Sequence, residues 1–183
     1  MPSNNINSHV GQSFPRARTP RNLANYQYVR QRSIPLDEFK WIRPNDLRGL
    51  ELPKPIVLVT GAFDILTASH MRLLFEARTK AGVNGTVLVA MNSDDSVSER
   101  KGKGRPILTF VERTATLAYM PIDILVEFGS ESELRQISEI AKPDLQVAGQ
   151  EYMNKQTTAN VPLFCIHEGG PHTSEIIKRV QKI

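Results

Sequence analysis

The chain has 183 residues and a formal net charge of +4, and 40% of its residues are hydrophobic, which is enough for one domain with a core and an extension. Its single cysteine, Cys165, excludes an internal disulfide, and its four histidines lack the spacing of a zinc site. No apolar run approaches the roughly 18 residues that span a bilayer, and the N-terminus lacks a signal-peptide apolar core. We therefore expect a protein of the cytoplasm or of an intracellular assembly, neither secreted nor membrane-bound.

The first 33 residues are rich in Asn, Ser, Pro, Gln and Arg and poor in aliphatic residues. Such a segment buries too little apolar surface to offset its ordering entropy, so alone it should be disordered. Residues 1–50 carry a net charge of +5 and residues 51–183 a net charge of −1, so the basicity belongs to this arm. The arm is a solvated tail, a mitochondrial presequence, or a segment that docks on a partner protein, a nucleic acid or its own dimer mate. Because few aromatic residues accompany the arginines, the nucleic-acid signal is weak.

Residues 34–54 contain several large apolar side chains and are expected to pack on the domain as a short helix and a strap. These side chains are Leu36, Phe39, Trp41, Ile42, Leu47 and Leu50. We accordingly divide the chain into a basic arm with its strap, residues 1–54, and a domain, residues 55–183.

From residue 55 onward, short β-branched apolar runs alternate with helical patterns. The runs are 56–60, 86–91, 124–128, 145–149 and 162–167. Continuous apolar runs suit strands that are buried on both faces. Strand–helix alternation favours parallel pairing with right-handed crossovers. The sequence therefore predicts an α/β domain with a five-stranded parallel sheet flanked by helices.

The helical patterns between these runs carry their own start and stop signals. Apolar residues recur at helical spacing over residues 70–81. Thr109 with Glu112, and Ser130 with Glu133, have the spacing of capping boxes that open two further helices. The last residues, 173–183, form an amphipathic pattern with basic residues near its C-terminal end, where the helix dipole favours them.

A parallel sheet of this kind binds ligands beyond the carboxyl ends of its strands, where the strand order reverses. The first strand of the domain ends at Thr60–Gly61 and leads to a helix that starts near Ser69–His70. A helix N-terminus offers unpaired N–H groups and a positive dipole, so it is a natural phosphate site. Polar clusters also follow other strands, at 92–95, 149–151 and 168–174, and the last opens another helix. Two helix N-termini could thus converge on one polyphosphate.

The segment 98–106 adds basic side chains and two glycines that allow mobility. Its cations are Arg100, Lys101, Lys103 and Arg105. Each feature also has an ordinary structural interpretation. The segment is then a solvated loop, Asp94 and Asp95 cap a turn, and His70 stacks or caps at a helix start.

Taken together, the order and spacing of these motifs are far more specific than any one of them. The motifs are TGAFDILTASH, AMNSDDSV, KGKGRP, Glu112-Arg113, KPDLQVAGQEY and GGPHTSEIIKRV. They run through residues 55–183, which resemble the cytidylyltransferase-like nucleotidyltransferase superfamily. Within it they most resemble the adenylyltransferase domain of ADP-heptose synthase and relatives such as glycerol-3-phosphate cytidylyltransferase. Residues 1–50 lie outside the resemblance.

This resemblance implies a Rossmann-like fold and an activity. Enzymes of the superfamily join a nucleoside triphosphate to a sugar phosphate or alcohol phosphate and release pyrophosphate. The substrate phosphate attacks the α-phosphorus in line, without a covalent intermediate, so positioning and charge neutralisation supply the catalysis. Mg²⁺ with ATP or CTP is the expected cofactor and nucleotide, and ATP is favoured. A homodimer is a further expectation, because relatives are often dimers.

The resemblance also implies roles for individual residues. The residues matched to catalytic positions are His70, Lys101, Thr67 and Arg105. Those matched to nucleotide-binding positions are Thr60, Gly61, Ala62, Phe63, Asp64, His172, Thr173 and Ser174. Those matched to the acceptor side are Asp94 and Arg113. No side chain is directly predicted to bind a metal.

Three residues depart from the pattern of the superfamily. Thr67 replaces the first histidine of a His-x-Gly-His signature, Ser69 replaces its glycine, and His172 replaces a serine before the last helix. A threonine hydroxyl donates a hydrogen bond but carries no charge, and charged donors bind about twice as strongly. Ser69 either adds a side chain beside the nucleotide or serves as the N-cap of the helix.

Two interpretations of these departures remain open from the sequence. In the first, the enzyme is active with altered chemistry, and His172 supplies the missing imidazole. In the second, catalysis has decayed, and the domain binds a nucleotide or serves as a structural subunit of a larger assembly through its arm. The basic arm favours the second interpretation. Retention of His70, Lys101, Arg105 and Thr173 favours phosphate binding in either case.

Overall fold

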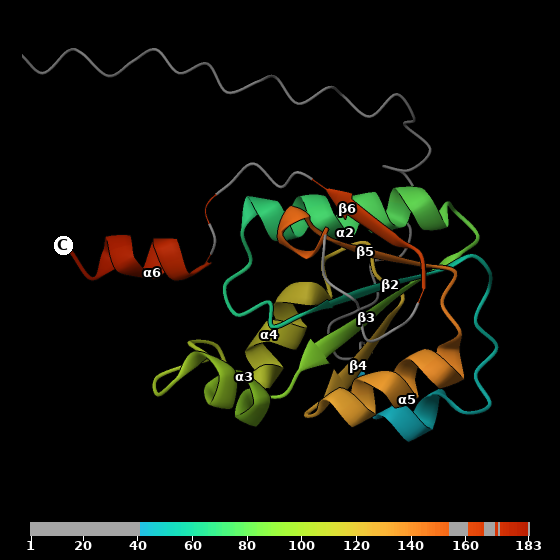
Figure 1. Cartoon of the computed structure of the whole chain (residues 1–183), viewed down its shortest axis with the longest axis horizontal. Helices are drawn as coiled ribbons and strands as arrows, with labels where there is room; N and C mark the ends of the chain where they lie inside the picture. Colours follow the sequence, from blue (N-terminus) through green and yellow to red (C-terminus); the bar gives the residue numbers. More distant parts are fainter. Residues whose placement is uncertain (1–40, 154–160, 167–170, 172, 183) are drawn as a thin grey trace, which may run out of the picture.

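A parallel six-stranded sheet forms the centre of the computed structural model, which describes residues 41–153, 161–166, 171 and 173–182 (Figure 1). The strands are β1 Trp41–Ile42, β2 Ile56–Gly61, β3 Thr86–Asn92, β4 Ile124–Phe128, β5 Leu145–Gly149 and β6 Leu163–Ile166. They lie in the order β1-β4-β3-β2-β5-β6, and every neighbouring pair is parallel. The five predicted strands are confirmed, but the predicted number was one too few. The sixth, β1, is two residues long, too short for a hydrophobic pattern to show.

Helices flank this sheet. They are α2 Ala68–Ala81, α3 Asp94–Lys101, α4 Phe110–Leu117, α5 Glu131–Ala141 and α6 Thr173–Val180, together with the 3-10 helices η1 Pro44–Leu47 and η2 Gln150–Tyr152. The four predicted helices are present, and the α/β, Rossmann-like architecture is confirmed. Helix α3 was not predicted. Residues 98–101, which were expected to belong to a loop, form its last turn. The hydroxyl of Ser93 accepts from the Ser96 N–H and caps α3, so the interpretation of Asp94 and Asp95 as turn caps is wrong.

The predicted capping signals are largely observed. The Thr109 hydroxyl accepts from the Glu112 N–H, and the Glu112 carboxylate accepts from the Thr109 N–H at 2.8 Å, which completes a capping box. The Ser130 hydroxyl caps α5 in the same way. Its expected partner Glu133 instead accepts from the N–H of Gly129, one residue before the cap. The sequence signal therefore identified both helix starts, although only one box is complete.

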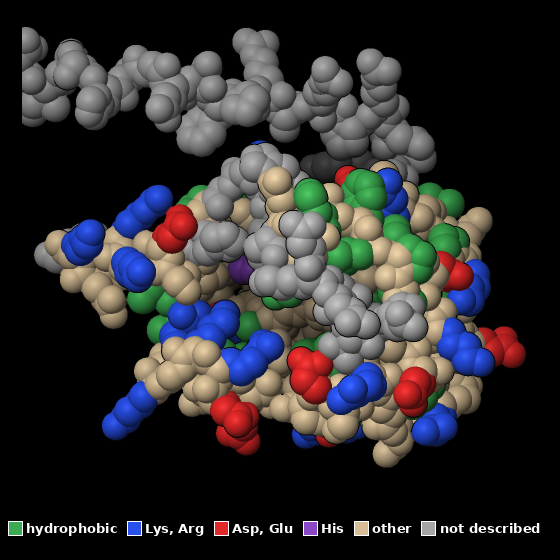
Figure 2. All heavy atoms as spheres, in the orientation of Figure 1, with side chains coloured by type: hydrophobic (Ala, Val, Ile, Leu, Met, Phe, Trp, Pro, Cys, Tyr) green, Lys and Arg blue, Asp and Glu red, His purple; other side chains and the backbone are tan. Residues whose placement is uncertain are grey.

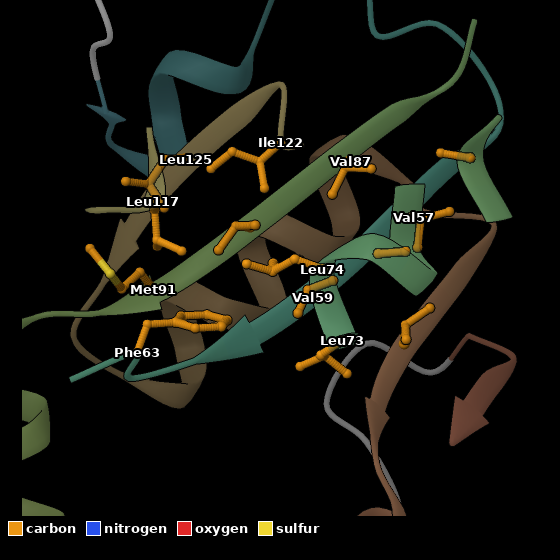
Figure 3. Packing of buried hydrophobic residues seen from close by; sticks show 14 of the residues in the cluster. Val57, Val59, Phe63, Leu73, Leu74, Val87, Met91, Leu117, Ile122 and Leu125 are labelled. Atoms are coloured by element: carbon orange, nitrogen blue, oxygen red, sulfur yellow. The ribbon is translucent and has the colours of Figure 1, made fainter. Parts of the chain in front are cut away.

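Apolar clusters cover both faces of the sheet. One cluster joins alternate residues of β2 and β3 to α2 and α4, and the other joins the opposite faces of these strands to α5 and η1. Figure 3 shows part of the first cluster, in which Val59 of β2 and Leu74 of α2 lie close together and Phe63 lies beside Met91. Burial on both faces explains why the strand sequences are continuous apolar runs instead of alternating ones.

At the amino end of the sheet, one buried arginine ties three segments together. Arg78 of α2 donates to the carbonyl oxygens of Pro121, Gly82 and Gly85, and it forms an ion pair with Asp123. The same carboxylate accepts from a backbone N–H at the start of β3. All of these groups are partnered, which buried charged groups require.

The strap is part of the domain where the structure describes it. Leu47 of η1 is buried in the cluster under α5, and Asn45 accepts from the Gln136 side chain of α5 at 2.6 Å. The indole of Trp41 packs edge-on against Phe110 with ring centroids 5.3 Å apart. Residues 1–40, and with them most of the predicted basic arm, lie outside the described residues. Within the described ranges, no helix combines the length and apolarity needed to cross a bilayer.

Candidate active site

The site predicted from the sequence lies where the order of the strands reverses. From β2 the chain proceeds through β3 and β4 on one side, whereas β5 and β6 lie on the other side of β2. The carboxyl end of β2 is therefore the switch point at which open α/β sheets bind ligands. The turn after β2 and the segments that contact it make up the candidate site.

The turn after β2 has a fixed shape. Phe63 is buried and has a φ of 49°, a left-handed conformation that is rare for a bulky residue and is concentrated at functional turns. A Cβ atom on Gly61 would lie 3.0 Å from the Phe63 ring, so any larger residue there would push the ring by a few tenths of an ångström. The Phe63 ring packs against the imidazole of His70, with centroids 5.3 Å apart. The turn thus sets the position of one face of His70.

The N-terminus of α2 orients the same histidine from the other side. Thr67 is the N-cap, and its hydroxyl accepts from the backbone N–H of His70. In return, the Thr67 backbone N–H donates to His70 Nδ1 at 3.2 Å, and the hydroxyl lies 3.1 Å from the same nitrogen. Because Nδ1 accepts a hydrogen bond, the proton of the neutral imidazole lies on Nε2. His70 is thereby prepared as a hydrogen-bond donor.

The interpretation of Ser69 as the N-cap is wrong, because α2 begins at Ala68 and Thr67 already occupies that position. Ser69 lies inside the first turn and is buried, and its hydroxyl has no hydrogen-bond partner among the described residues. The direct catalytic contact predicted for Thr67 stays a prediction. Its observed contacts are those of a residue that positions His70.

Asp64 connects the turn to the basic segment after α3. Its side chain is 0% exposed. One carboxylate oxygen accepts from the backbone N–H groups of Ile107 and Leu108 at 2.7 and 3.0 Å. The other accepts from Arg105 Nε at 2.7 Å and forms an ion pair with the same guanidinium. Residues more than 40 positions apart in the sequence are therefore held together at the carboxyl end of β2.

The two residues matched to the acceptor side also meet. Arg113 is 0% exposed; it donates to the Ala62 carbonyl in the turn and, at 2.6 Å, to Asp94. Asp94 accepts in addition from the backbone N–H of Phe110, which starts α4. These contacts join the turn, α3 and α4. The acceptor contacts of both residues stay predictions, and the enclosure of Arg113 argues that it acts by holding the site together.

Several cations gather around this arrangement. Partial desolvation lowers the pKa of Lys101, and the neighbouring charges of Arg105, Arg100 and Arg113 lower it further, whereas Asp64 opposes them. Desolvation is the largest of these causes, and the three arginines place further positive charge near the Lys101 ammonium. Figure 2 shows Lys and Arg side chains on both sides of a hollow between α6 and α3. Such a surface is suited to an anion.

The start of α6 contacts the same region. The buried hydroxyl of Thr173 donates to the Ile65 carbonyl at 3.1 Å, which places the N-terminus of α6 against the segment that leads into α2. The expected approach of two helix N-termini to one site is therefore supported. Ser174 follows on the exposed side. His172, and with it the proposed replacement imidazole, lies outside the described residues.

Sequence reasoning missed Gln146 of β5. Its side chain is buried, its amide nitrogen lies 3.5 Å from the Thr60 hydroxyl, and its amide oxygen has no partner among the described residues. Gln146 is aligned with Leu58 of β2 and contacts Thr60, which lies two residues nearer the carboxyl end of that strand. The available signal was a polar residue within the otherwise apolar run LQVAG.

Comparisons with known proteins agree with this geometry. Residues 58–178 match the family described as cytidylyltransferase-like. Two curated relatives are both named bifunctional protein HldE: that of Psychromonas ingrahamii is 38% identical over 135 residues, and that of Helicobacter hepaticus is 34% identical over 169 residues. The alignments cover 69% and 89% of this chain but only 28% and 33% of those proteins. The chain thus spans about a third or less of these relatives.

A solved structure is also similar. The lipopolysaccharide core biosynthesis protein from Thermoplasma volcanium is 25% identical, and the match covers 61% of this chain and 95% of that chain with a TM-score of 0.48.

Proposed function

Because the chain belongs to the cytidylyltransferase-like family, we propose that it is a nucleotidyltransferase that transfers a nucleoside monophosphate from ATP or CTP to a sugar phosphate or alcohol phosphate. The similarity to HldE proteins and to the adenylyltransferase domain of ADP-heptose synthase favours ATP and a sugar phosphate. The observation that carries the proposal is the arrangement around the turn after β2, where the N-termini of α2 and α6 and the basic segment all contact one turn.

The reaction requires an in-line displacement at the α-phosphorus. An oxygen of the acceptor phosphate forms a new P–O bond, the bond to the bridging oxygen between the α- and β-phosphorus breaks, and pyrophosphate leaves with that oxygen. Positioning and neutralisation of the phosphate charges lower the barrier. No protein nucleophile takes part.

The residues of this chain supply donors and positive charge. His70 donates from Nε2 to phosphate oxygens, and the backbone N–H groups at the starts of α2 and α6 bind further oxygens. Lys101, which is exposed beside the site, neutralises charge on the phosphates. Thr67 supplies no charge of its own and acts by orienting His70.

Mg²⁺ is the metal expected to accompany the triphosphate. Mg²⁺ is usually bound by one or two carboxylates together with substrate phosphates. The described residues contain no cluster of three or more His, Cys, Asp or Glu side chains that would bind it without substrate. The phosphate oxygens would therefore provide most of its ligands, and the metal would draw charge away from the leaving pyrophosphate.

The proposal is tested by pyrophosphate release from ATP or CTP with Mg²⁺ and a panel of sugar and alcohol phosphates. Wild type should turn over with at least one pair. His70→Ala should lower kcat per folded molecule about 10²–10³-fold, the usual cost of one donor to developing charge. Thr67→His, which restores the superfamily residue, should keep or raise turnover. A folded wild type that neither releases pyrophosphate nor binds either nucleotide in calorimetry would contradict the proposal.

A further inference from the structure

We propose that Asp64 is a positioning residue that holds the basic segment 101–108 against the site. Arg105 then contributes by pairing with Asp64 and does not bind the substrate. The inference rests on the proposed function, because it states which cation of that site meets the polyphosphate. Lys101 then becomes the phosphate-binding cation of the segment. The resemblance alone assigns Lys101 and Arg105 the same role, so the structure separates two residues that the sequence pattern groups together.

The two oxygens of Asp64 have separate tasks. Oδ1 accepts from the backbone N–H groups of Ile107 and Leu108, which fixes the path of the chain into α4. Oδ2 accepts from Arg105 Nε at 2.7 Å and lies 2.5 Å from Nη2 of the same residue. A carboxylate that is 0% exposed and bonded on both oxygens has no capacity left for a ligand.

Arg105 is committed to this carboxylate. Its side chain is only 13% exposed, and two of its nitrogens face Asp64. Moving the guanidinium to a phosphate would leave a buried carboxylate without its counter-charge, which is among the costlier changes in a protein interior. Arg105 is therefore poorly suited to bind substrate directly and well suited to anchor the segment that carries it.

Lys101 ends α3, whose Arg100 donates to Asn92 at 2.8 Å, and the chain after it makes few other contacts. Gly102 and Gly104 have φ values of 91° and 85°, and a Cβ atom on either would meet nothing within 4 Å. Residues 101–104 are exposed. Their backbone bonds within the described residues are local: the Gly102 N–H donates to Ser98, and the Arg105 N–H donates to Gly102. The contacts of Asp64 with Arg105, Ile107 and Leu108 are thus the long-range bonds that hold the chain after Lys101 against the turn that follows β2.

Asp64→Asn tests the tie with little change in shape. The asparagine oxygen can still accept from Ile107 and Leu108, whereas its NH₂ group replaces the oxygen that holds Arg105. Trypsin cleavage after Lys101 and Lys103 reports the opening of the segment, since the Arg105–Pro106 bond resists trypsin. Cleavage should be about ten- to a hundredfold faster in the variant, the effect on an opening equilibrium of losing one charged hydrogen bond.

A double-mutant cycle distinguishes the tie from a direct phosphate contact. If Asp64 and Arg105 act as one unit, Asp64→Asn, Arg105→Gln and the double variant should accelerate cleavage to a similar degree, without additivity. Their kcat values should fall together by about 10²-fold through misplacement of Lys101, with smaller changes in the KM for the nucleotide. If Arg105 binds phosphate, Arg105→Gln alone should raise the KM, and the two effects should add.

Asp144→Asn is the matched control. Asp144 is a carboxylate with a similar arrangement at the opposite end of the sheet, where it accepts from the Ile56 N–H at 2.7 Å and pairs with Lys54 at 3.1 Å. Its loss should leave both cleavage rate and turnover at wild-type values. Equal cleavage rates in wild type and Asp64→Asn, or additive effects in the cycle, would overturn the inference.

The cleavage experiment needs no substrate, so it remains informative if no turnover is found. In that case the proposed function fails while accelerated, non-additive cleavage still supports the tie. If Asp64→Asn does not fold, Arg105→Lys provides the comparison with wild type, because it keeps a positive charge beside the buried carboxylate but loses the contact through two nitrogens.

Discussion

Buried arginines lie at both ends of the parallel sheet, but their surroundings differ. At the amino end, Arg78 makes four contacts, to three carbonyl oxygens and to Asp123. At the carboxyl end, Nε of the fully enclosed Arg113 has no partner among the described residues, and the same is true of the Ser69 hydroxyl and the Gln146 amide oxygen. Buried polar groups are normally paired, so unpaired ones require an explanation.

This difference shows at which end of the sheet the buried polar groups are satisfied by the protein's own contacts. The contacts of Arg78 pair the buried polar groups around it at the amino end and stabilise the fold. The unpaired atoms gather where the turn after β2 meets α2, α4 and β5, which is where the proposed substrates bind. Changes at the amino end should therefore affect the free energy of unfolding, and changes at the carboxyl end should affect turnover.

The largest expected effect is at the amino end. Arg78→Met removes one partner of a buried ion pair, so that Asp123 loses its counter-charge and three carbonyl oxygens lose this donor. Such changes cost about 3–5 kcal/mol. Urea unfolding should show this loss, while turnover per folded molecule stays at the wild-type value. A loss of unfolding free energy below about 1 kcal/mol, the usual range of an exposed pair, would show that Arg78 does not stabilise the amino end in the way described.

At the carboxyl end the effect should reverse. Lys101→Ala removes an exposed cation, so the melting temperature should not change. The kcat for pyrophosphate release should fall about 10²–10³-fold, because a donor to the developing charge is lost. Lys103→Ala, two residues further along the same segment, is the control and should have a much smaller effect. Equal effects of the two variants would mean that the segment provides only diffuse charge.

The dependence of turnover on pH sharpens the same comparison. Desolvation and neighbouring arginines lower the pKa of Lys101 from its ordinary value of 10.5. The ammonium is charged below this lowered pKa and loses its proton above it, so turnover should decline on the alkaline side before ordinary lysines titrate. Lys101→Arg keeps its charge throughout and should shift that decline to higher pH, whatever its absolute activity. If wild type and Lys101→Arg lose turnover at the same alkaline pH, the decline belongs to the titration of another group.

The smallest effect is expected for Asp144→Asn at the amino end. The backbone N–H of Ile56 lowers the pKa of Asp144. A lowered pKa means that the ionised carboxylate stabilises the fold above its ordinary pKa of 3.8 and that this contribution is lost as the pH falls through the folded-state value. Since the side chain is partly exposed, neutral-pH urea unfolding should show a loss of at most about 1 kcal/mol, which disappears in acid. A difference that persists in acid would point to the lost geometry instead of the charge.

Much of the fold could be predicted from the sequence, because local patterns determine it. Strands buried on both faces are visible as continuous apolar runs, and Thr109 and Ser130 mark helix starts through contacts only three residues long. Helix α3 could not be predicted in this way. Its sequence DDSVSERK has a single apolar residue, so no periodicity indicates that it packs.

The sequence predicted which positions make up the candidate site but not how their side chains pair with one another. Its motifs meet at the carboxyl end of β2 because the sheet is parallel, which the strand pattern already implied. The pairing of Asp64 with Arg105 and of Asp94 with Arg113 joins residues 41 and 19 positions apart. Such pairs depend on the packing of several elements, and nothing local in the sequence distinguishes an anchoring arginine from one that binds phosphate.

The packing of Trp41 against Phe110 has a practical consequence. Trp41 is the only tryptophan of the chain, and Phe110 is the residue whose backbone N–H is held by Asp94. The indole is thus one aromatic contact away from the Asp94–Arg113 pair. Intrinsic fluorescence excited at the tryptophan band therefore provides an optical signal from a single known position. The proposed binding of a nucleotide can be tested by titration of the unlabelled protein with this emission as the signal.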